Sequence, residues 1–290
     1  MRKLLALLLT LWIAPALAQV PMTGAGKGTP AGYVGPGDLG IGSFDGWYSC
    51  ATAFTSAFAA TLGAVCDVVD SATGLVTCTF HMQASGQTNP AECNASACAT
   101  ACKVTKAYDQ TGNGRDASQV TLSAMPTLTL SALNGLPGMT CSGGTCIMST
   151  ASFTTRAQPY TYVSVATRPS GGGGGAIGDG NGLTFLGFGA SNLAALYGGT
   201  SVTATASDAS YHATSGLASG SGNNCALNVD GSDTASLNCG TTSAMNGLRI
   251  HRGGGTNFVG TVMEAGMIGA TTTSGNRNSY SSNAHTRYSF

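Results

Sequence analysis

One run of turn-forming residues, Ala107-Tyr108-Asp109-Gln110-Thr111-Gly112-Asn113-Gly114-Arg115-Asp116, stands out in the sequence. An extended apolar stretch, residues 104–108, leads into it. Asp and Asn side chains bond to their own backbone and tolerate the left-handed conformation, while Gly112 and Gly114 adopt positive φ without steric cost. The pattern therefore predicts a tight turn that joins two strands.

Two interpretations of this turn stay open. In the first, the turn is structural and locks its two strands together, because only some loops on rigid scaffolds carry function. In the second, the oxygens of Asp109, Asn113 and Asp116 hold a hard cation such as calcium, although their spacing differs from that of the helix–loop–helix calcium loops. The sequence indicates no other cofactor.

The segment Tyr108–Gly114 resembles the Tyr-Asp-Gln-Ser-Gly-Asn-Gly signature in the catalytic domain of the family 54 glycoside hydrolases, the arabinofuranosidase B group. Related signatures occur in concanavalin A-like, laminin-G-like sandwich domains that have no known chemistry. The resemblance extends from about Trp47 to the C-terminus. It implies a concanavalin A-like two-sheet β-sandwich (jelly roll) that removes arabinofuranosyl side chains from plant polysaccharides.

The N-terminus predicts export. Arg2 and Lys3 precede the apolar run Leu4–Ile13, and Ala16-Leu17-Ala18 supplies a small-residue cleavage pattern, so residues 1–18 are interpreted as a signal peptide. This run is too short to span a bilayer comfortably, and no later stretch predicts a transmembrane segment. We expect a secreted or periplasmic protein.

The region after the signal peptide predicts a linker and then one domain. Residues 19–40 are rich in Gly and Pro and have no hydrophobic period, so they are expected to form a linker before a single domain over residues 41–290. Apolar residues then recur at helical spacing from Trp47 to Leu62, with Asp45 placed as an N-cap, which predicts one short N-terminal helix. We expect its aromatic face to pack on the sandwich.

The remaining sequence predicts strands. Tyr160–Thr167 alternates and is rich in Tyr, Val and Thr, while Thr127–Leu133 runs into the hairpin signal Asn134-Gly135. Short strands separated by turn residues favour an all-β, disulfide-rich sandwich. Charged residues make up 8% of the chain, its net charge is zero, and no basic patch is visible, which argues against a nucleic-acid partner.

Ten cysteines in an exported chain predict disulfides, up to five of them. Cys225 and Cys239 flank a hairpin signal and should pair, and Cys141 and Cys146 should close a small loop. The cluster Cys93, Cys98 and Cys102 is expected to contain a local bridge, and the resemblance implies the same. Cys50, Cys66, Cys78 and one cysteine of the cluster remain, and the sequence leaves their connectivity open.

Glycoside hydrolysis uses two carboxyl groups that flank the bond. Glu264 is a candidate because a carboxylate in an apolar strand should be either paired or functional. Asp208 lies in a polar stretch between strands that could border a cleft, and His212 nearby could imitate part of a triad. Asp179 is interpreted as a turn residue.

The catalytic pair of the resembling family does not transfer to this chain. The family's acid/base lies in a Gly-Gly-Asp-Asn context, and the matching segment Gly253–Asn257 contains no carboxylate. The family's nucleophile lies in an Asp-Met-Glu-Asn-Asn context, which has no counterpart between Leu183 and Cys225.

Two functions therefore stay open. The first is a secreted arabinofuranosidase that uses Glu264 and Asp208. The second is a non-catalytic concanavalin A-like module that binds glycan or serves as a surface component. In either case the expected partner is a polysaccharide or glycan. The candidate binding residues are Asp109 and Asn113 in the turn, together with the aromatic residues Trp47, Tyr197 and Tyr211.

Overall fold

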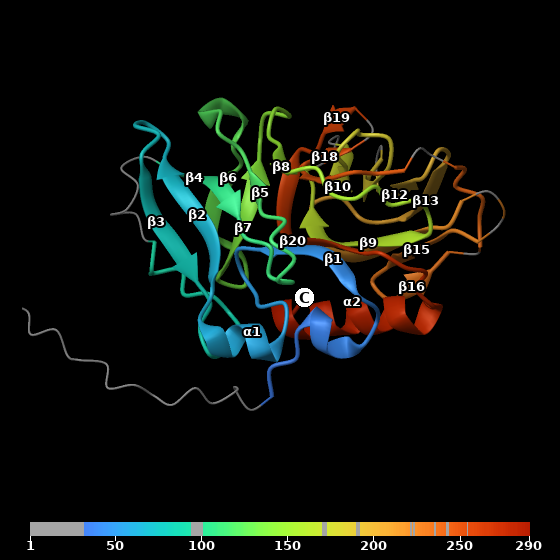
Figure 1. Ribbon diagram of the computed structural model, residues 1–290, viewed down its shortest axis with the longest axis horizontal. Helices are drawn as coiled ribbons and strands as arrows, with labels where there is room; N and C mark the ends of the chain where they lie inside the picture. The colour runs from blue at the N-terminus through green and yellow to red at the C-terminus, as the bar shows by residue number, and fades with distance from the viewer. Residues whose placement is uncertain are drawn as a thin grey trace, which may run out of the picture.

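The computed structural model is a two-layer β-sandwich with both α-helices on one side of the strands (Figure 1). Residues 1–31, which include the predicted signal peptide and most of the predicted linker, lie outside the part that the structure describes, and so does Cys98. The described residues are 32–93, 101–169, 173–189, 192–220, 222, 224–234, 236–241, 244–253 and 255–290.

The first sheet is built around β20 (Gly260–Ile268), all nine residues of which are buried. β9 (Tyr160–Thr167) pairs with one edge of β20, and β7 (Leu136–Cys141) and β1 (Phe44–Ser49) pair in succession with the other edge. Beyond β9 the sheet continues through β14 (His212–Ala218), β15 (Ala226–Val229) and β16 (Ser232–Asp233).

The second sheet packs against the first. Its strands follow one another in the spatial order β3 (Val76–His81), β2 (Ala64–Asp70), β4 (Cys102–Ala107), β5 (Ala117–Ser118), β8 (Met148–Thr150), β17 (Leu248–Ile250), β10 (Gly174–Asp179), β11 (Phe185–Phe188), β12 (Leu193–Tyr197) and β13 (Ser201–Thr205). β6 (Thr127–Leu133) pairs with β7, and the short hairpin of β18 (Arg252–Gly253) and β19 (Thr256–Asn257) lies beside β10.

Strand β9 shows why the central strands are apolar on both faces. Tyr160 and Tyr162 point into the core between the two sheets. Val163 and Val165 point to the other face, into a second core under helix α2 (Ser274–Tyr288). Since both faces are covered, nearly every residue of β9 is buried, which confirms the strand predicted over these residues.

The predicted N-terminal helix begins later than expected. Residues 44–49 form β1, and helix α1 covers only Ser56–Thr61, after a Thr55 cap whose side chain accepts a hydrogen bond from the Phe58 N–H. The helical spacing was misleading because Trp47 and Phe54 contact the same core from a strand and a loop. Trp47 is completely buried, so its ring is not available to a ligand.

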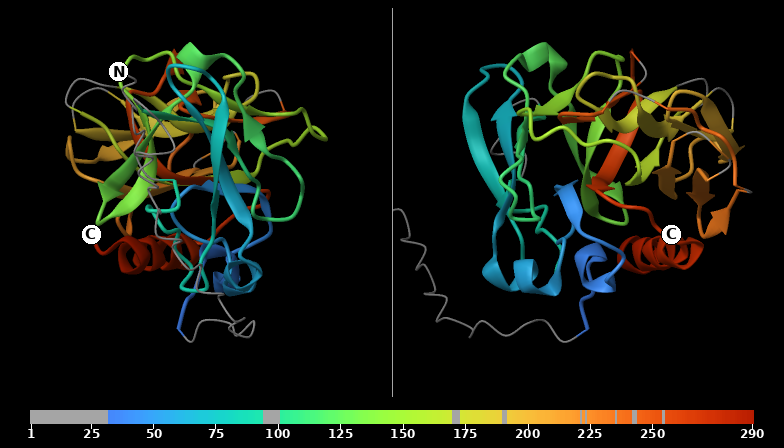
Figure 2. Two further views of the ribbon diagram at one scale, coloured as in Figure 1. Left: turned by 90° about the vertical axis from the view of Figure 1, so that its left-hand side faces the viewer. Right: turned by 45° about the vertical axis from the view of Figure 1, so that its right-hand side comes forward.

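Helix α2 was not predicted. It lies on the same side of the strands as α1, as two further views show (Figure 2). Its buried residues recur at helical spacing, but they are mainly Arg, Tyr and Ser rather than aliphatic residues, so no hydrophobic period marks them: Arg277, Tyr280, Ser281, Ala284, Arg287 and Tyr288. No helix in the described residues has the length and hydropathy that crossing a membrane requires.

Two 3₁₀-helices complete the fold, η1 (Pro36–Leu39) and η2 (Leu122–Ala124). The helix η1 lies at the end of the predicted linker and packs on the domain. The Gly37 N–H donates to the Phe54 carbonyl, and the Tyr33 hydroxyl donates to the Ala53 carbonyl.

The disulfides agree with the sequence where the structure describes them. The bridges Cys225–Cys239 and Cys141–Cys146 are confirmed, and Cys50–Cys66 and Cys78–Cys93 supply pairs that the sequence left open. Cys102 is also disulfide-bonded. Cys98, the remaining member of the cluster in which a local bridge was predicted, lies outside the described residues. No free cysteine occurs in the described part of the chain.

Candidate functional site

The signature turn between β4 and β5 uses its polar atoms for its own structure. Oδ1 of Asp109 accepts hydrogen bonds from the Thr111 N–H at 3.1 Å and the Thr111 hydroxyl at 2.7 Å, and Oδ2 accepts from the Arg115 N–H at 3.1 Å. The Asn113 amide donates to the Phe44 carbonyl on β1 at 3.0 Å, which fastens the turn to the first sheet.

Asp116, the third of the candidate cation ligands in the turn, is engaged in the same way. Asp116 accepts from the Asp109 N–H at 2.9 Å and pairs with the Lys106 ammonium at 2.7 Å. Among the described residues, no three His, Cys, Asp or Glu side chains gather in a group that could hold a metal ion. These contacts give the polar side chains of the turn a structural role.

Glu264 lies completely buried beneath α2. The register of β20 against β9 shifts between Val262 and Glu264, and the Glu264 carboxylate faces the helix. The carboxylate pairs through both oxygens with Arg287, at 2.7 Å for Oε1, and accepts from the hydroxyls of Tyr280 at 2.9 Å and Tyr288 at 2.8 Å.

This network holds both charges in the interior. Burial acts to lower the pKa of Arg287, but the Glu264 carboxylate outweighs it and raises that pKa, so the guanidinium stays charged. Glu264 therefore connects the first sheet to α2 through hydrogen bonds and an ion pair, away from solvent.

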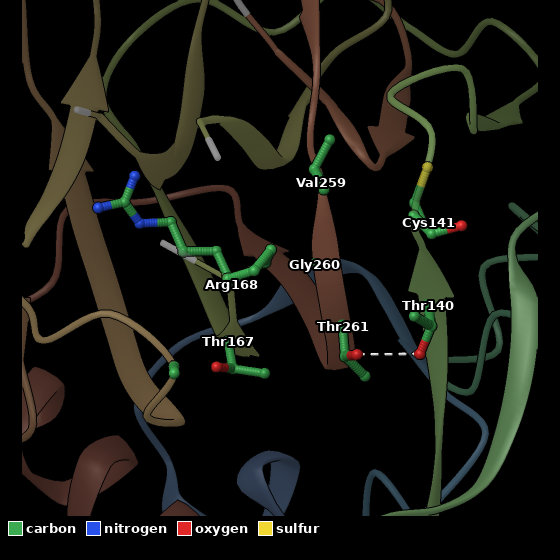
Figure 3. Close-up of a pocket in the computed structure, with 10 residues that line it drawn as sticks. Thr140, Cys141, Thr167, Arg168, Val259, Gly260 and Thr261 are labelled. Carbon is green, nitrogen blue, oxygen red and sulfur yellow. Dashed lines mark hydrogen bonds between the residues drawn. The ribbon is translucent and has the colours of Figure 1, made fainter. Parts of the chain in front are cut away.

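Asp208 lies next to a hollow of about 370 Å³ on the outer face of the first sheet. The hydroxyls of Thr140 and Thr261 lie 2.9 Å apart across its floor, and the Arg168 guanidinium points away from them (Figure 3). Arg168 pairs with Asp208 and donates to the Gly189 carbonyl. The hollow thus offers hydroxyl groups that bond to one another and no free carboxylate. Its lining consists of Thr140, Cys141, Ser142, Thr167, Arg168, Pro169, Ala209, Val259, Gly260 and Thr261.

His212 pairs with Asp230 rather than with Asp208. Its Nδ1 lies 2.5 Å from the Asp230 carboxylate, and its Nε2 lies 3.0 Å from the Ser207 carbonyl oxygen and 3.3 Å from the Ser207 hydroxyl. Burial acts to lower the pKa of His212, but the bonds to Asp230 and to the Ser207 carbonyl raise it. Both ring nitrogens of His212 therefore face oxygen atoms of Asp230 and Ser207, and neither contacts Asp208.

A second hollow, of about 460 Å³, carries aromatic side chains and is called the aromatic hollow below. It is lined by Gly182, Leu183, Phe185 and Tyr197. Phe185 and Tyr197 lie opposite each other on β11 and β12, and their rings stack with centroids 5.7 Å apart and planes 11° from parallel. Both rings are half-buried, so they present apolar surface to the hollow.

The segment that matches the family's acid/base context lies at this aromatic hollow. Gly253 packs so tightly on Phe185 that a Cβ on Gly253 would lie 2.2 Å from the Phe185 Cβ. The nitrogen of Gly255, a residue at φ +77°, lies 3.7 Å from the position of a Cβ on Gly182. The segment that matches the family's acid/base context in sequence therefore lies beside the aromatic hollow in the structure.

Asp179 is the carboxyl group beside the aromatic hollow. It is completely buried at the end of β10, and its Oδ1 accepts from the N–H groups of Leu183 at 2.6 Å and Thr184 at 3.3 Å. This confirms its predicted role in the turn. Burial raises the pKa of Asp179, against the opposing effect of those N–H groups and of Arg249.

No protein-family model and no curated protein sequence matches the chain. Among solved structures, a GH54 α-L-arabinofuranosidase soaked with a cyclic sulfate inhibitor is similar at a TM-score of 0.68 and 17% identity. The match covers 88% of this chain and 66% of that chain. An arabinofuranosidase complexed with arabinofuranosyl-α-1,2-xylobiose matches at 0.67 and 16% identity, over 88% of this chain and 65% of that chain. The chain thus spans just under two thirds of these structures and shares the fold of the arabinofuranosidase catalytic domain.

Proposed function

We propose that this chain is an exported glycan-binding protein that holds arabinofuranosyl-bearing polysaccharide in the aromatic hollow without cleaving it. The similar solved structures contain arabinofuranosides, which supports the choice of sugar. Export rests on the signal-peptide pattern of residues 1–18. Stacked aromatic rings at the floor of a hollow supply the apolar surface on which a sugar ring can lie.

The proposal that the glycan is bound but not cleaved rests on the aromatic hollow, whose lining contains no pair of carboxyl groups. A retaining glycosidase needs two carboxyl groups about 5 to 5.5 Å apart, and an inverting one needs them somewhat farther apart. All twelve acidic residues fall within the described ranges. Of these acidic residues, Asp179 is the one that raises the pKa of Arg249, which lies at the hollow.

The two carboxyl groups proposed from sequence are held elsewhere. Glu264 is sealed beneath α2. Asp208 accepts from the Asn192 N–H in the closed turn of the β11–β12 hairpin, whereas Phe185 and Tyr197 lie at the open end of that hairpin. Neither group can therefore join Asp179 to form a pair.

Removal of both rings should abolish most of the binding. We expect the Phe185→Ala/Tyr197→Ala variant to bind arabinoxylan about thirtyfold more weakly, because truncating a central aromatic contact costs about 2 kcal/mol or more. Affinity electrophoresis in gels that contain arabinoxylan measures the change. Leu75→Ala, which removes a side chain 68% exposed on the β2–β3 turn, is the matched control and should migrate like the wild type. Equal retardation of the double variant and the wild type would show that the glycan binds elsewhere.

A further inference from the structure

Two arginines at the aromatic hollow differ from the other arginines of the described chain. Seven arginines fall in the described residues, and five of them form ion pairs: Arg115 and Arg156 with Asp45, Arg168 with Asp208, Arg277 with Asp233 and Arg287 with Glu264. Arg249 and Arg252 form none within that part of the chain. The other described arginines each pair with a carboxylate, so Arg249 and Arg252 are the two guanidinium groups that could still bind an anion.

Both side chains are half-buried. A terminal nitrogen of Arg249 lies 3.8 Å from the position of a Cβ on Gly182, which lines the hollow. The charge of Arg252 lies close enough to Arg249 to lower the pKa of that guanidinium. The Nε of Arg252 is buried and has no hydrogen-bond partner among the described residues. A buried donor without an acceptor carries a desolvation cost.

One carboxyl group, Asp179, acts against the positive charge of the two arginines. Burial and the charge of Arg252 lower the pKa of Arg249, and only Asp179 acts against them. Oδ1 of Asp179 already accepts two backbone hydrogen bonds, and burial raises the pKa of this carboxyl group. The aromatic hollow therefore combines a stacking surface with an excess of positive charge.

We propose that Arg249 and Arg252 bind a carboxylate of the glycan, so that the ligand is an acidic arabinofuranosyl polysaccharide that carries uronic acid. This inference rests on the proposed glycan-binding function. The planar guanidinium fork matches the two oxygens of a carboxylate, and such charge-assisted bonds are stronger than those to neutral hydroxyls. A sugar stacked on Phe185 or Tyr197 would place its carboxylate beside the two arginines.

The test compares one polymer in two forms. Binding of wild type and of Arg249→Gln/Arg252→Gln to glucuronoarabinoxylan is measured by titration calorimetry, with the native polymer and with the same polymer after its carboxylates are reduced to alcohols. Lys103→Gln/Lys106→Gln, which removes two positive charges from β4, is the control, and a thermal melt of each variant checks the fold. Dextran sulfate supplies an anion of different chemistry.

We expect the wild type to bind the native polymer at least tenfold more tightly than the reduced one, since each charged hydrogen bond contributes more than a neutral one. The arginine variant should lose this preference and keep its binding to the reduced polymer, while the lysine variant should behave like the wild type. Equal binding of both polymers by a folded wild type would overturn the inference and leave the proposed function standing. Binding of neither would refute the proposed function itself. Dextran sulfate binding as tightly as the native polymer would overturn the assignment of a carboxylate.

Discussion

Replacing Glu264 with Gln should lower the free energy of unfolding by about 3 to 5 kcal/mol, the usual cost of removing one partner from a buried ion pair. The substitution keeps the shape of the side chain but leaves Arg287 charged, with 3% of its side chain exposed. The two tyrosine hydroxyls that donate to the carboxylate would also lose a charged acceptor. Urea denaturation followed by the fluorescence of Trp47, which lies against Tyr280, measures the loss.

Two further variants separate charge from packing in this network. Glu264→Gln/Arg287→Met removes the unpaired charge and should recover part of the lost stability. Glu92→Gln is the control, because the Glu92–His81 pair lies at the surface with side chains 32% and 48% exposed, where ion pairs contribute about 0 to 1 kcal/mol. A loss at Glu264 no larger than that at Glu92 would contradict the assigned role of the buried pair.

The stability of the fold should fall as the pH drops from 6.5 to 4, and His251 should account for about 3 kcal/mol of that fall. His251 is completely buried, and burial lowers its pKa to about 4, against backbone groups of Met139 and Phe258 that act to raise it. The unfolded chain takes up this proton near pH 6.5. Between the two values the unfolded state binds more protons, so the free energy of unfolding decreases with falling pH.

The pH dependence is isolated by comparing the wild type with His251→Leu. The variant should lack the contribution of His251 to the pH dependence. The difference in free energy of unfolding between the two proteins should therefore change by about 3 kcal/mol between pH 6.5 and 4. His212 acts in the opposite sense, because its raised pKa gives stability that is present below pH 6.5 and lost above it. His81→Gln, at an exposed position, is the control. Parallel curves for the wild type and His251→Leu would show that the buried ring does not titrate in this way.

Local signals predicted the parts of the fold that local chemistry determines. The strand predicted at Tyr160–Thr167 matches β9. The alternation of residue types along this segment remains visible in the sequence although both faces of the strand are buried. Asn134 and Gly135 have the positive φ values, 49° and 80°, that their hairpin turn requires. The polar stripe of α2 gave no such signal, because Arg287 and its neighbours are buried only through a partner on a distant strand.

The candidate site was harder to predict, because its residues are brought together by pairing rather than by sequence. Phe185 and Tyr197 are twelve positions apart, and only the register of the β11–β12 hairpin stacks them. Tyr197 was among the aromatic candidates, but Phe185 gave no signal beyond its place in a strand. Arg249 and Arg252 were missed because a sequence does not reveal which arginines lack an ion-pair partner.

The most direct test of the central claim measures binding and cleavage on the same sample. Wild-type protein is run in arabinoxylan affinity gels and is also incubated with arabinoxylan and with 4-nitrophenyl α-L-arabinofuranoside, while released arabinose and nitrophenol are quantified. We expect retardation in the gel and no release above the protein-free blank. Release that rises in proportion to protein concentration, and that disappears in Asp179→Asn, would contradict the claim.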